Sequence, residues 1–291
     1  MFTQFFGNYL LNKGLVSASQ LSDALSVQKH TRLKLGVLAI NAGYMTAEQV
    51  DMVHAAQQKV DKRIGDIACE MGFLTEGKVM ELLKSQGAAH LQLGQALVDS
   101  GAMTNAQFAD ALKGYKTENS LNDVDFTDPN GEKLNDIIAA FYRFDGEDKG
   151  ELLTEYVTLL FKNIIRFIGD DFTPLAFEKL PSARLNFSAK QAMNGALVCS
   201  TYLEAPEQAY ISFATRYAGE DIVEPDEMAD ASCGEFLNLH NGLYCVNISN
   251  ERDMEIKLEP QEYIRSESIS GPVYRIPLVF PFGTVNFLIT L

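Results

Sequence analysis

The sequence predicts two domains of different class: an all-α helical repeat module, followed by an α+β domain. The first observation is an unbroken 29-residue spacing between Gly7, Gly36, Gly65 and Gly94. Repetition at such a period indicates an array of one supersecondary unit. The second is that the chain ends in runs of alternating apolar residues, which are typical of strands. The predicted boundaries are 1–115 for four repeats, 116–131 for a linker and 132–291 for the α+β domain.

Each repeat is predicted to contain two short helices. A second glycine, suited to the left-handed position after helix one, follows seven residues later in every copy, at Gly14, Gly43, Gly72 and Gly101. A Ser or Thr then stands at a suitable N-cap position for helix two. In three copies a Gln follows three residues later, which completes a capping box: Ser17 with Gln20, Thr46 with Gln49 and Thr104 with Gln107.

The repeat pattern resembles the N-terminal module of the GspE/MshE-type secretion and pilus-assembly ATPases. That resemblance implies a tandem R-L-G-x-x-L-L-x-x-G-L-L motif, which binds cyclic di-GMP in some members. The leading Arg position holds Phe5, Lys34, Arg63 and Gln92, so only Lys34 and Arg63 keep two cations in register. They are the candidate ligand-binding residues. A protein-docking or purely structural array is the alternative.

The charge distribution narrows the classes of partner. Residues 1–115 carry ten basic and ten acidic residues, so the net charge of −15 lies in the rest of the chain. An acidic half argues against nucleic acid and anionic membranes as partners. The four cysteines show no metal-ligand spacing, and no metal site is expected.

The N-terminal residues do not form a secretory signal, and the most apolar stretch, Leu152–Ile168, contains Lys162 and Arg166. A cytoplasmic protein without a membrane span is therefore expected. A homodimer is left open.

The elements of the second half follow from local pattern. A short helix is predicted over about 132–142, and a longer one over about 150–168 with an apolar stripe. Strands are predicted at 184–190 and 196–204 around the Asn194-Gly195 turn, and a helix from Pro206 to about Gly219. Met254–Leu258 and Val285–Leu291 alternate as strands, with a turn at Pro281–Thr284.

One segment, Pro225–Gly242, could carry chemistry. On a helix its apolar residues share one side, and Glu235 and Asn238 lie together on the opposite side. Their neighbours Ala231 and Gly242 are small, so the pair is expected on an exposed, uncrowded ridge that could enter another protein's site. An ordinary polar pair on a solvated face is the alternative. His240 is expected to pack in the core, and no role is assigned to His30, His54 or His90.

Two runs, ATRYAGEDIVEPDEMADASCGEFLNLHNG and ISGPVYRIPLVFPFGTVNFLITL, resemble the CheC/CheX group of chemotaxis phosphatases, CheX most closely. In that group a helix ending before a glycine carries E-x-x-N, here Glu235 and Asn238 before Gly242. Relatives of CheC carry a second E-x-x-N on an earlier helix. The corresponding predicted helix here, about 150–168, offers only Glu155 and Asn163, which are eight residues apart, so a single site is expected.

The resemblance implies hydrolysis of the aspartyl phosphate on a response regulator receiver domain. Asn238 would orient the attacking water, and Glu235 would pair with a lysine of the phosphorylated partner. No cofactor is expected on this chain, because the partner receiver domain would supply Mg²⁺. The alternatives are a non-catalytic adaptor that binds a receiver or a secretion or pilus component, and a cyclic di-GMP effector acting through Lys34 and Arg63.

Overall fold

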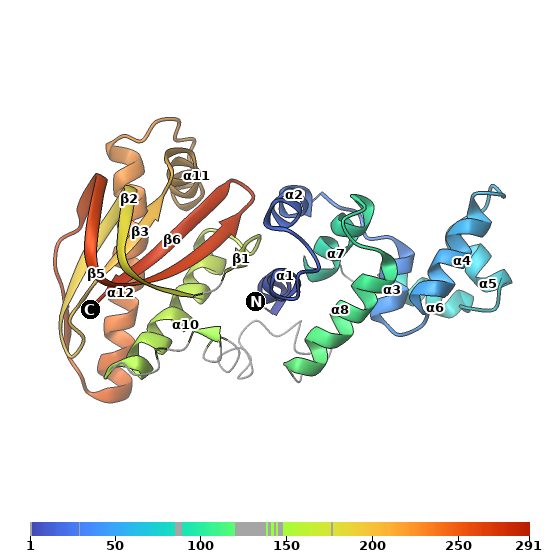
Figure 1. Ribbon diagram of the computed structural model, residues 1–291, viewed down its shortest axis with the longest axis horizontal. Coiled ribbons are helices and arrows are strands. Elements are labelled where there is room, and N and C mark those ends of the chain that lie inside the picture. Colours follow the sequence, from blue (N-terminus) through green and yellow to red (C-terminus); the bar gives the residue numbers. More distant parts are fainter. Residues whose placement is uncertain are drawn as a thin grey trace. The chain divides into compact units, whose positions relative to one another are not determined.

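The computed structural model describes residues 2–28, 30–84, 89–119, 138, 141–142, 144, 148–175 and 177–291. These residues fall into two compact units, 2–119 and 138–291. Figure 1 labels the helices and strands of both.

The first unit is built from helices, two in each 29-residue repeat. They are α1 (Phe2–Asn12), α2 (Ala18–Gln28), α3 (Leu35–Asn41), α4 (Ala47–Gln57), α5 (Ile64–Glu70), α6 (Glu76–Lys84), α7 (Ala89–Asp99) and α8 (Asn105–Glu118).

The local signals that delimit these helices are confirmed. Thr46 and Thr104 each form a complete capping box. Ser17 and Gln20 exchange the same two hydrogen bonds, at 2.9 and 3.2 Å. The four glycines after helix one have φ between 65° and 73°, the left-handed conformation expected there.

The order of the repeats in space differs from their order along the chain. The first repeat packs on the fourth, through α1 and α2 against α7. The fourth packs on the second, through α7 and α8 against α3, and the second on the third. A stacked array would place sequence neighbours side by side, whereas here the order is first, fourth, second, third (Figure 1).

An aromatic cluster accounts for this order. Phe6 and Tyr9 of α1 meet Phe108 and Tyr115 of α8, with ring centroids 5.4–6.3 Å apart. No other repeat carries aromatic side chains at these positions. Burying large rings against one another stabilises contacts beyond their area alone, so the first and fourth repeats are matched partners.

The first glycine of the repeat has a packing role in the second, third and fourth helix pairs, at Gly36, Gly65 and Gly94. A Cβ built on Gly36 would lie 2.6 Å from Val50 Cγ1, and one on Gly94 would lie 2.1 Å from Phe108 Cε2. Helix two therefore crosses helix one so closely that only a hydrogen fits. This contact explains why a glycine recurs every 29 residues.

We expect Gly94→Ala to lower the free energy of unfolding by about 1–3 kcal/mol, because the methyl group must displace the buried Phe108 ring. Gly77→Ala is the matched control. Gly77 lies in α6, and a Cβ built on it would lie 4.0 Å from its nearest neighbour, Thr75 Oγ1. Alanine should stabilise that helix by about 0.5–1 kcal/mol. Urea denaturation followed by circular dichroism measures both changes, and equal effects of the two variants would contradict the packing role.

The predicted linker begins too early. Helix α8 continues to Glu118, whose carboxylate pairs with Lys13 Nζ at 2.7 Å, and Lys116 Nζ donates to Asn41 Oδ1 at 3.1 Å. These contacts hold residues 116–118 in the helix. Residues 120–131 and most of the predicted helix at 132–142 lie outside the described residues.

The second unit combines helices with an antiparallel sheet. Its elements are α10 (Gly150–Phe167), β1 (Thr173–Pro174), β2 (Glu178–Gly195), β3 (Cys199–Ala205), α11 (Glu207–Ala218), α12 (Glu227–Arg252), β4 (Ile256–Leu258), β5 (Glu262–Phe280) and β6 (Gly283–Thr290). The strand order is β1-β5-β6-β3-β2-β4. The mixed α+β class predicted for this half is what the structure shows.

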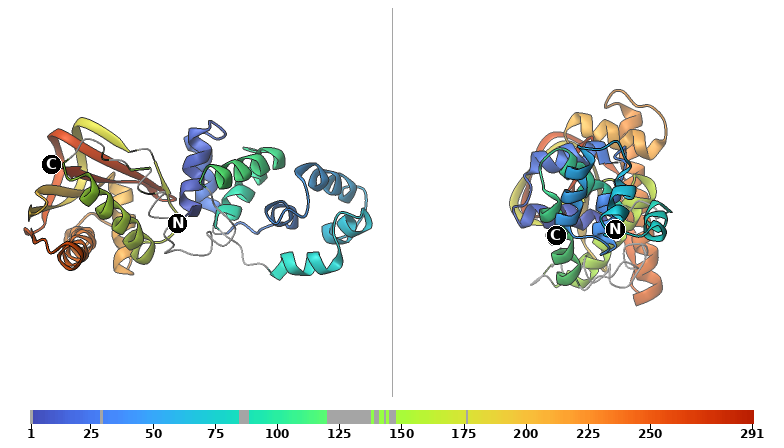
Figure 2. Two further views of the ribbon diagram at one scale, coloured as in Figure 1. Left: turned by 90° about the horizontal axis from the view of Figure 1, so that it is seen from below. Right: turned by 90° about the vertical axis from the view of Figure 1, so that its right-hand side faces the viewer.

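Two long strands bend the sheet back on itself. The first part of β5 pairs with β2 and its second part with β6, so β2, β3, β6 and β5 form a closed circuit of neighbours. The residues Leu185, Tyr202, Val273 and Leu288 of these strands form a buried apolar cluster. Helices α11 and α12 pack on the sheet, with α10 beside α12 (Figures 1 and 2).

Most predicted elements of this unit are confirmed, but β2 is longer than predicted, and β3 and β4 are shorter. The predicted apolar stripe of α10 is buried at Leu153, Val157, Leu160 and Ile164, whereas its last member, Phe167, is half-buried. Helix α11 begins directly after Pro206 and ends at Gly219, whose φ is 71°. Strand β2 begins six residues earlier than predicted because Glu178–Leu185 pairs with β5, a contact between residues far apart in the chain.

Helix α12 does not end before Gly242, as the resemblance implied, but continues to Arg252. A glycine without a neighbouring cap does not terminate a helix. The apolar face continues through buried Tyr244 and Ile248, and the helix ends only at Asp253 with φ 53°.

Across the residues that the structure describes, no helix is both long and apolar enough to cross a bilayer.

Candidate functional site

The candidate site lies on the outward face of α12. Asp226 caps the helix by accepting hydrogen bonds from the backbone N–H of Met228 and Ala229, at 3.0 and 3.1 Å. The predicted apolar face is confirmed, since every member of it has no exposed surface: Ala229, Cys233, Phe236, Leu237 and His240. That buried face fixes the rotation of the helix, and with it the direction of Glu235.

Glu235 is exposed, with two tyrosines close to its carboxylate. Burial raises the pKa of Tyr217 above its usual value, and the charge of Glu235 raises it further. The pKa of Tyr263 is also raised, first by burial and then by the negative charges of Asp230 and Glu235. The Tyr263 hydroxyl lies along α12 at Gly234, where an added Cβ would be only 2.6 Å from it.

Asn238 differs from the free ridge residue that was expected. It is half-buried, and its Oδ1 accepts a hydrogen bond of 2.9 Å from Gln191 Nε2 on β2. Glu235 and Asn238 thus stand together on the helix, but they differ in freedom. Among the described residues the Glu235 carboxylate forms no hydrogen bond, whereas the Asn238 carboxamide is bonded to the sheet.

Sequence reasoning missed the residues that hold Asn238. Gln191 and Asn241 are buried, and Asn241 Nδ2 donates to Gln191 Oε1 at 2.8 Å. The available signal was a polar residue within an apolar alternation, because Gln191 stands between buried Ala189 and Met193 on the same side of β2. Asn241, three residues after Asn238 on the apolar side of the helix, was a second such signal.

The histidines carry no role in this site. His240 is buried against Tyr156 and shares a 3.0 Å hydrogen bond between its Nδ1 and Asn163 Nδ2. Burial lowers the pKa of His240 to about 3, so the ring is neutral at ordinary pH. The prediction of a packed core histidine is confirmed.

Helix α10 offers no second carboxylate–carboxamide pair from Glu155 and Asn163. Glu155 is ion-paired with Arg252, and Asn163 is buried against His240.

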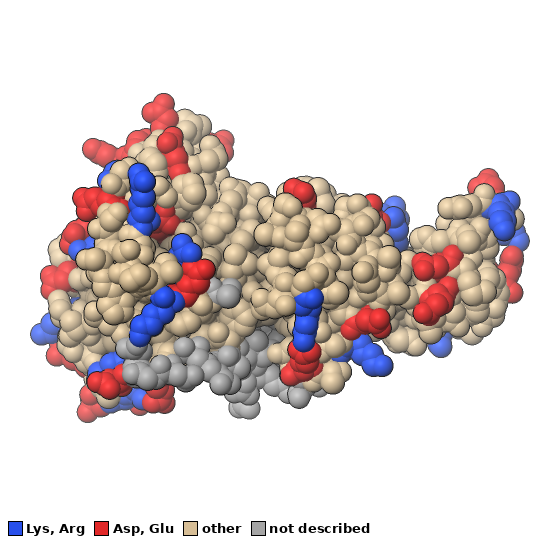
Figure 3. Space-filling view, in the orientation of Figure 1, with Lys and Arg blue, Asp and Glu red and all other residues tan. Residues whose placement is uncertain are grey.

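Acidic side chains gather just before the site. The segment from Glu220 to Asp230 contains six Asp and Glu residues and no Lys or Arg. Figure 3 shows this acidic surface over the connection between α11 and α12. The Asp230 carboxylate is ion-paired with Arg265, with 2.5 Å between Oδ1 and Nη2. It also accepts a hydrogen bond of 2.9 Å from the Tyr210 hydroxyl. The other carboxylates give this segment a negative charge, suited to a partner with basic groups.

In the repeat unit, Lys34 and Arg63 have different surroundings. Lys34 Nζ pairs with Asp99 of α7 at 2.6 Å. Arg63 lines a cavity of about 370 Å³ together with Leu35 and the acidic residues Asp66 and Glu76. Cyclic di-GMP binding there stays a prediction.

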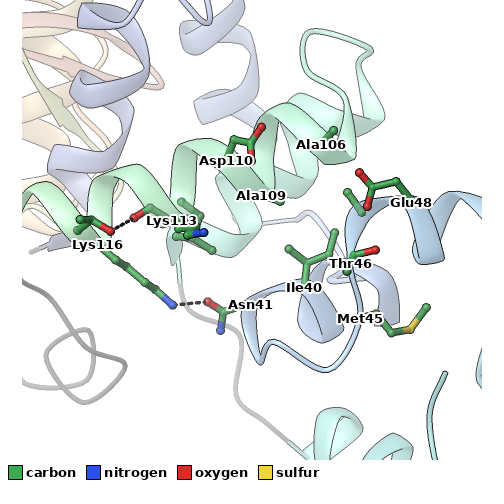
Figure 4. A pocket seen from close by; sticks show the side chains of 13 residues that line it. Ile40, Asn41, Met45, Thr46, Glu48, Ala106, Ala109, Asp110, Lys113 and Lys116 are labelled. Carbon is green, nitrogen blue, oxygen red and sulfur yellow. Dashed lines mark hydrogen bonds between the residues drawn. The ribbon is translucent and has the colours of Figure 1, made fainter.

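A second hollow, of about 430 Å³, lies between the α3–α4 turn and α8. Figure 4 shows Lys113 and Lys116 on one side and Glu48 and Asp110 nearby. Its charges are mixed, so it favours no anionic ligand.

In the described parts of the chain, no group of three or more His, Cys, Asp or Glu side chains is arranged to hold a metal ion.

No protein-family model and no curated protein matches the sequence. Solved structures similar to about half of the chain include a chemotaxis protein CheX from Desulfovibrio desulfuricans, at 21% identity and a TM-score of 0.43, covering 48% of this chain and 99% of that one. Chemotaxis protein CheX from Vibrio vulnificus is 17% identical, with a TM-score of 0.41 and coverage of 48% and 97%. A CheX–CheY–BeF₃–Mg²⁺ complex from Borrelia burgdorferi is 12% identical, with a TM-score of 0.38 and coverage of 47% and 95%.

Proposed function

We propose that the second unit dephosphorylates a response regulator by hydrolysing the aspartyl phosphate of its receiver domain. The observation that carries this proposal is the pairing of an exposed Glu235 with a tethered Asn238 on the outward face of one rigid helix. The resemblance of the E-x-x-N segment and the terminal strands to the CheC/CheX group supports it.

The chemistry needs little from this chain beyond the side chains of this helix. Water attacks phosphorus, the bond between phosphorus and the aspartyl oxygen breaks, and inorganic phosphate and a free aspartate result. Such a reaction depends mainly on in-line positioning and charge neutralisation. Asn238 orients the water, and the receiver brings the phosphorylated aspartate and Mg²⁺.

Glu235 has a different part, which is to hold the complex together. It is exposed on α12, and its carboxylate can pair with a lysine of the receiver.

The decisive experiment is to time phosphate loss from a panel of phosphorylated receiver domains with and without this protein. An accelerated loss from at least one receiver supports the proposal. Binding to a phosphorylated receiver without acceleration would replace it with the adaptor function.

We expect Glu235→Ala to raise the Kd for the phosphorylated receiver roughly tenfold, because one charge-assisted hydrogen bond across the interface is lost. Fluorescence titration at several salt concentrations measures this, and the salt dependence of Kd should flatten in the variant. Glu251→Ala is the matched control, an exposed carboxylate at the far end of the same helix. An unchanged Kd for Glu235→Ala would remove the assigned part of Glu235.

A further inference from the structure

A chain of buried polar side chains runs beneath Asn238. Tyr156 donates its hydroxyl to Asn241 Oδ1 at 2.8 Å, and Asn241 Nδ2 donates to Gln191 Oε1 at 2.8 Å. Gln191 Nε2 then donates to Asn238 Oδ1 at 2.9 Å. Tyr156, Asn241 and Gln191 are each at most 2% exposed. Buried polar groups are costly unless they are paired, so this network has one strongly favoured arrangement.

The direction of the hydrogen bonds at Gln191 is set by a backbone carbonyl. Gln191 Nε2 also donates to the carbonyl oxygen of Glu259, at 3.0 Å. A carbonyl can only accept, so the amide end of Gln191 that faces Glu259 must be the NH₂ group. That same NH₂ group faces Asn238, which must therefore present its oxygen to Gln191.

A second backbone carbonyl sets the other end of the network. Thr201 Oγ1 donates to the carbonyl oxygen of Gln191 at 3.1 Å, and this uses its only proton. Thr201 therefore accepts from Asn241 Nδ2, 3.0 Å away, and the same nitrogen donates to Gln191 Oε1. A rotated Gln191 would set oxygen against the Glu259 carbonyl and nitrogen against Asn241 Nδ2. Both contacts are repulsive.

We infer that Gln191 is a positioning residue that fixes which end of the Asn238 carboxamide meets the partner. Because Oδ1 is held inward, Nδ2 is the end left for the partner, and in the described part of the chain it makes no hydrogen bond. The site therefore offers a hydrogen-bond donor to the reacting groups. This inference rests on the proposed function. It adds that Asn238 meets the partner with its donor end, Nδ2, and not with its acceptor end, Oδ1.

A donor suits the proposed reaction. The attacking water has two lone pairs. One accepts from Asn238 Nδ2, which leaves the other to form the bond to phosphorus. Asn238 therefore orients the lone pairs of the water oxygen and not the protons of the water. A rigidly held donor also avoids the loss of side-chain freedom during the reaction.

The activity test compares two amide variants of β2. Gln191→Met keeps the length of the side chain but cannot donate to Asn238. Asn194→Ala is the control, since Asn194 Nδ2 donates to the Glu259 carboxylate at 2.9 Å without contacting Asn238. We expect Gln191→Met to lower kcat for receiver dephosphorylation about 10–100-fold. KM should stay within about twofold, and the control should match wild type in both constants.

A purely structural role would lower the melting temperature and the active fraction, but not the turnover number of the folded protein. If folded Gln191→Met matches wild type in kcat, the inference fails while the proposed function stands. If the wild type accelerates no receiver, the proposed function fails.

Side-chain amide NMR on the ¹⁵N-labelled whole protein tests the direction of the hydrogen bond between Gln191 and Asn238 without an activity measurement. Signals are assigned by their loss in Gln191→Met and Asn238→Ala. The Gln191 NH₂ protons should exchange slowly with water, because both are hydrogen-bonded, and the Asn238 NH₂ protons should exchange at least tenfold faster. Slow exchange at Asn238 together with fast exchange at Gln191 would overturn the inference.

Discussion

Asn238→Ala is expected to lower kcat for receiver dephosphorylation on the order of 100-fold or more, because a group that acts on the reacting water contributes mainly in the transition state. The Kd for the phosphorylated receiver should change by less than about threefold, since Asn238 is half-buried and tied to Gln191. Phosphate half-life and a binding titration separate the two effects.

The matched control for this variant is Asn247→Ala. Asn247 is an exposed asparagine on the same helix, nine residues further on. It should leave both kcat and Kd at the wild-type values. Equal activity of wild type and Asn238→Ala would reduce the E-x-x-N pair to an ordinary surface feature and favour the adaptor function.

The second large effect is expected from Phe236→Ala. This side chain is fully buried, and its ring packs against Phe213, Tyr217 and Phe287 at centroid distances of 5.1, 5.8 and 6.0 Å. Removing it leaves a cavity and should lower the free energy of unfolding of the second unit by about 3–5 kcal/mol. Denaturant unfolding of the whole chain, followed by near-ultraviolet circular dichroism, measures the loss.

Leu243→Ala is the control for Phe236→Ala. Leu243 lies on the same helix but is 38% exposed, so truncating it should cost under about 1 kcal/mol. A stability loss from Phe236→Ala no larger than that of the control would show that this face of α12 is not part of the core. Phe236 and Asn238 are two residues apart, yet one should affect stability and the other turnover.

Local signals in the sequence were sufficient for much of the fold. The capping boxes at Thr46 and Thr104 and the left-handed glycines depend on neighbours within a few residues. The rotation of α12 was predictable for the same reason, because a 3.6-residue period alone assigns Phe236 to the core and Glu235 to the surface.

Contacts between distant residues were not predictable in this way. The placement of the fourth repeat between the first and the second depends on rings of α1 meeting rings of α8, about a hundred residues apart in the chain. The extra length of β2 depends likewise on pairing with β5. A single sequence records which residues are apolar, but not which distant partner each of them finds.

The sequence by itself determined that Glu235 and Asn238 share one outward helix face, because a helix brings residues three apart together whatever surrounds it. Only the tertiary structure decided that Asn238 is tethered and which end of its carboxamide is left for a partner. That outcome depends on Gln191, 47 residues earlier, and on the carbonyl of Glu259, 68 residues beyond Gln191. The physical reason is that hydrogen-bond polarity passes from group to group through buried contacts, and only packing brings those groups together.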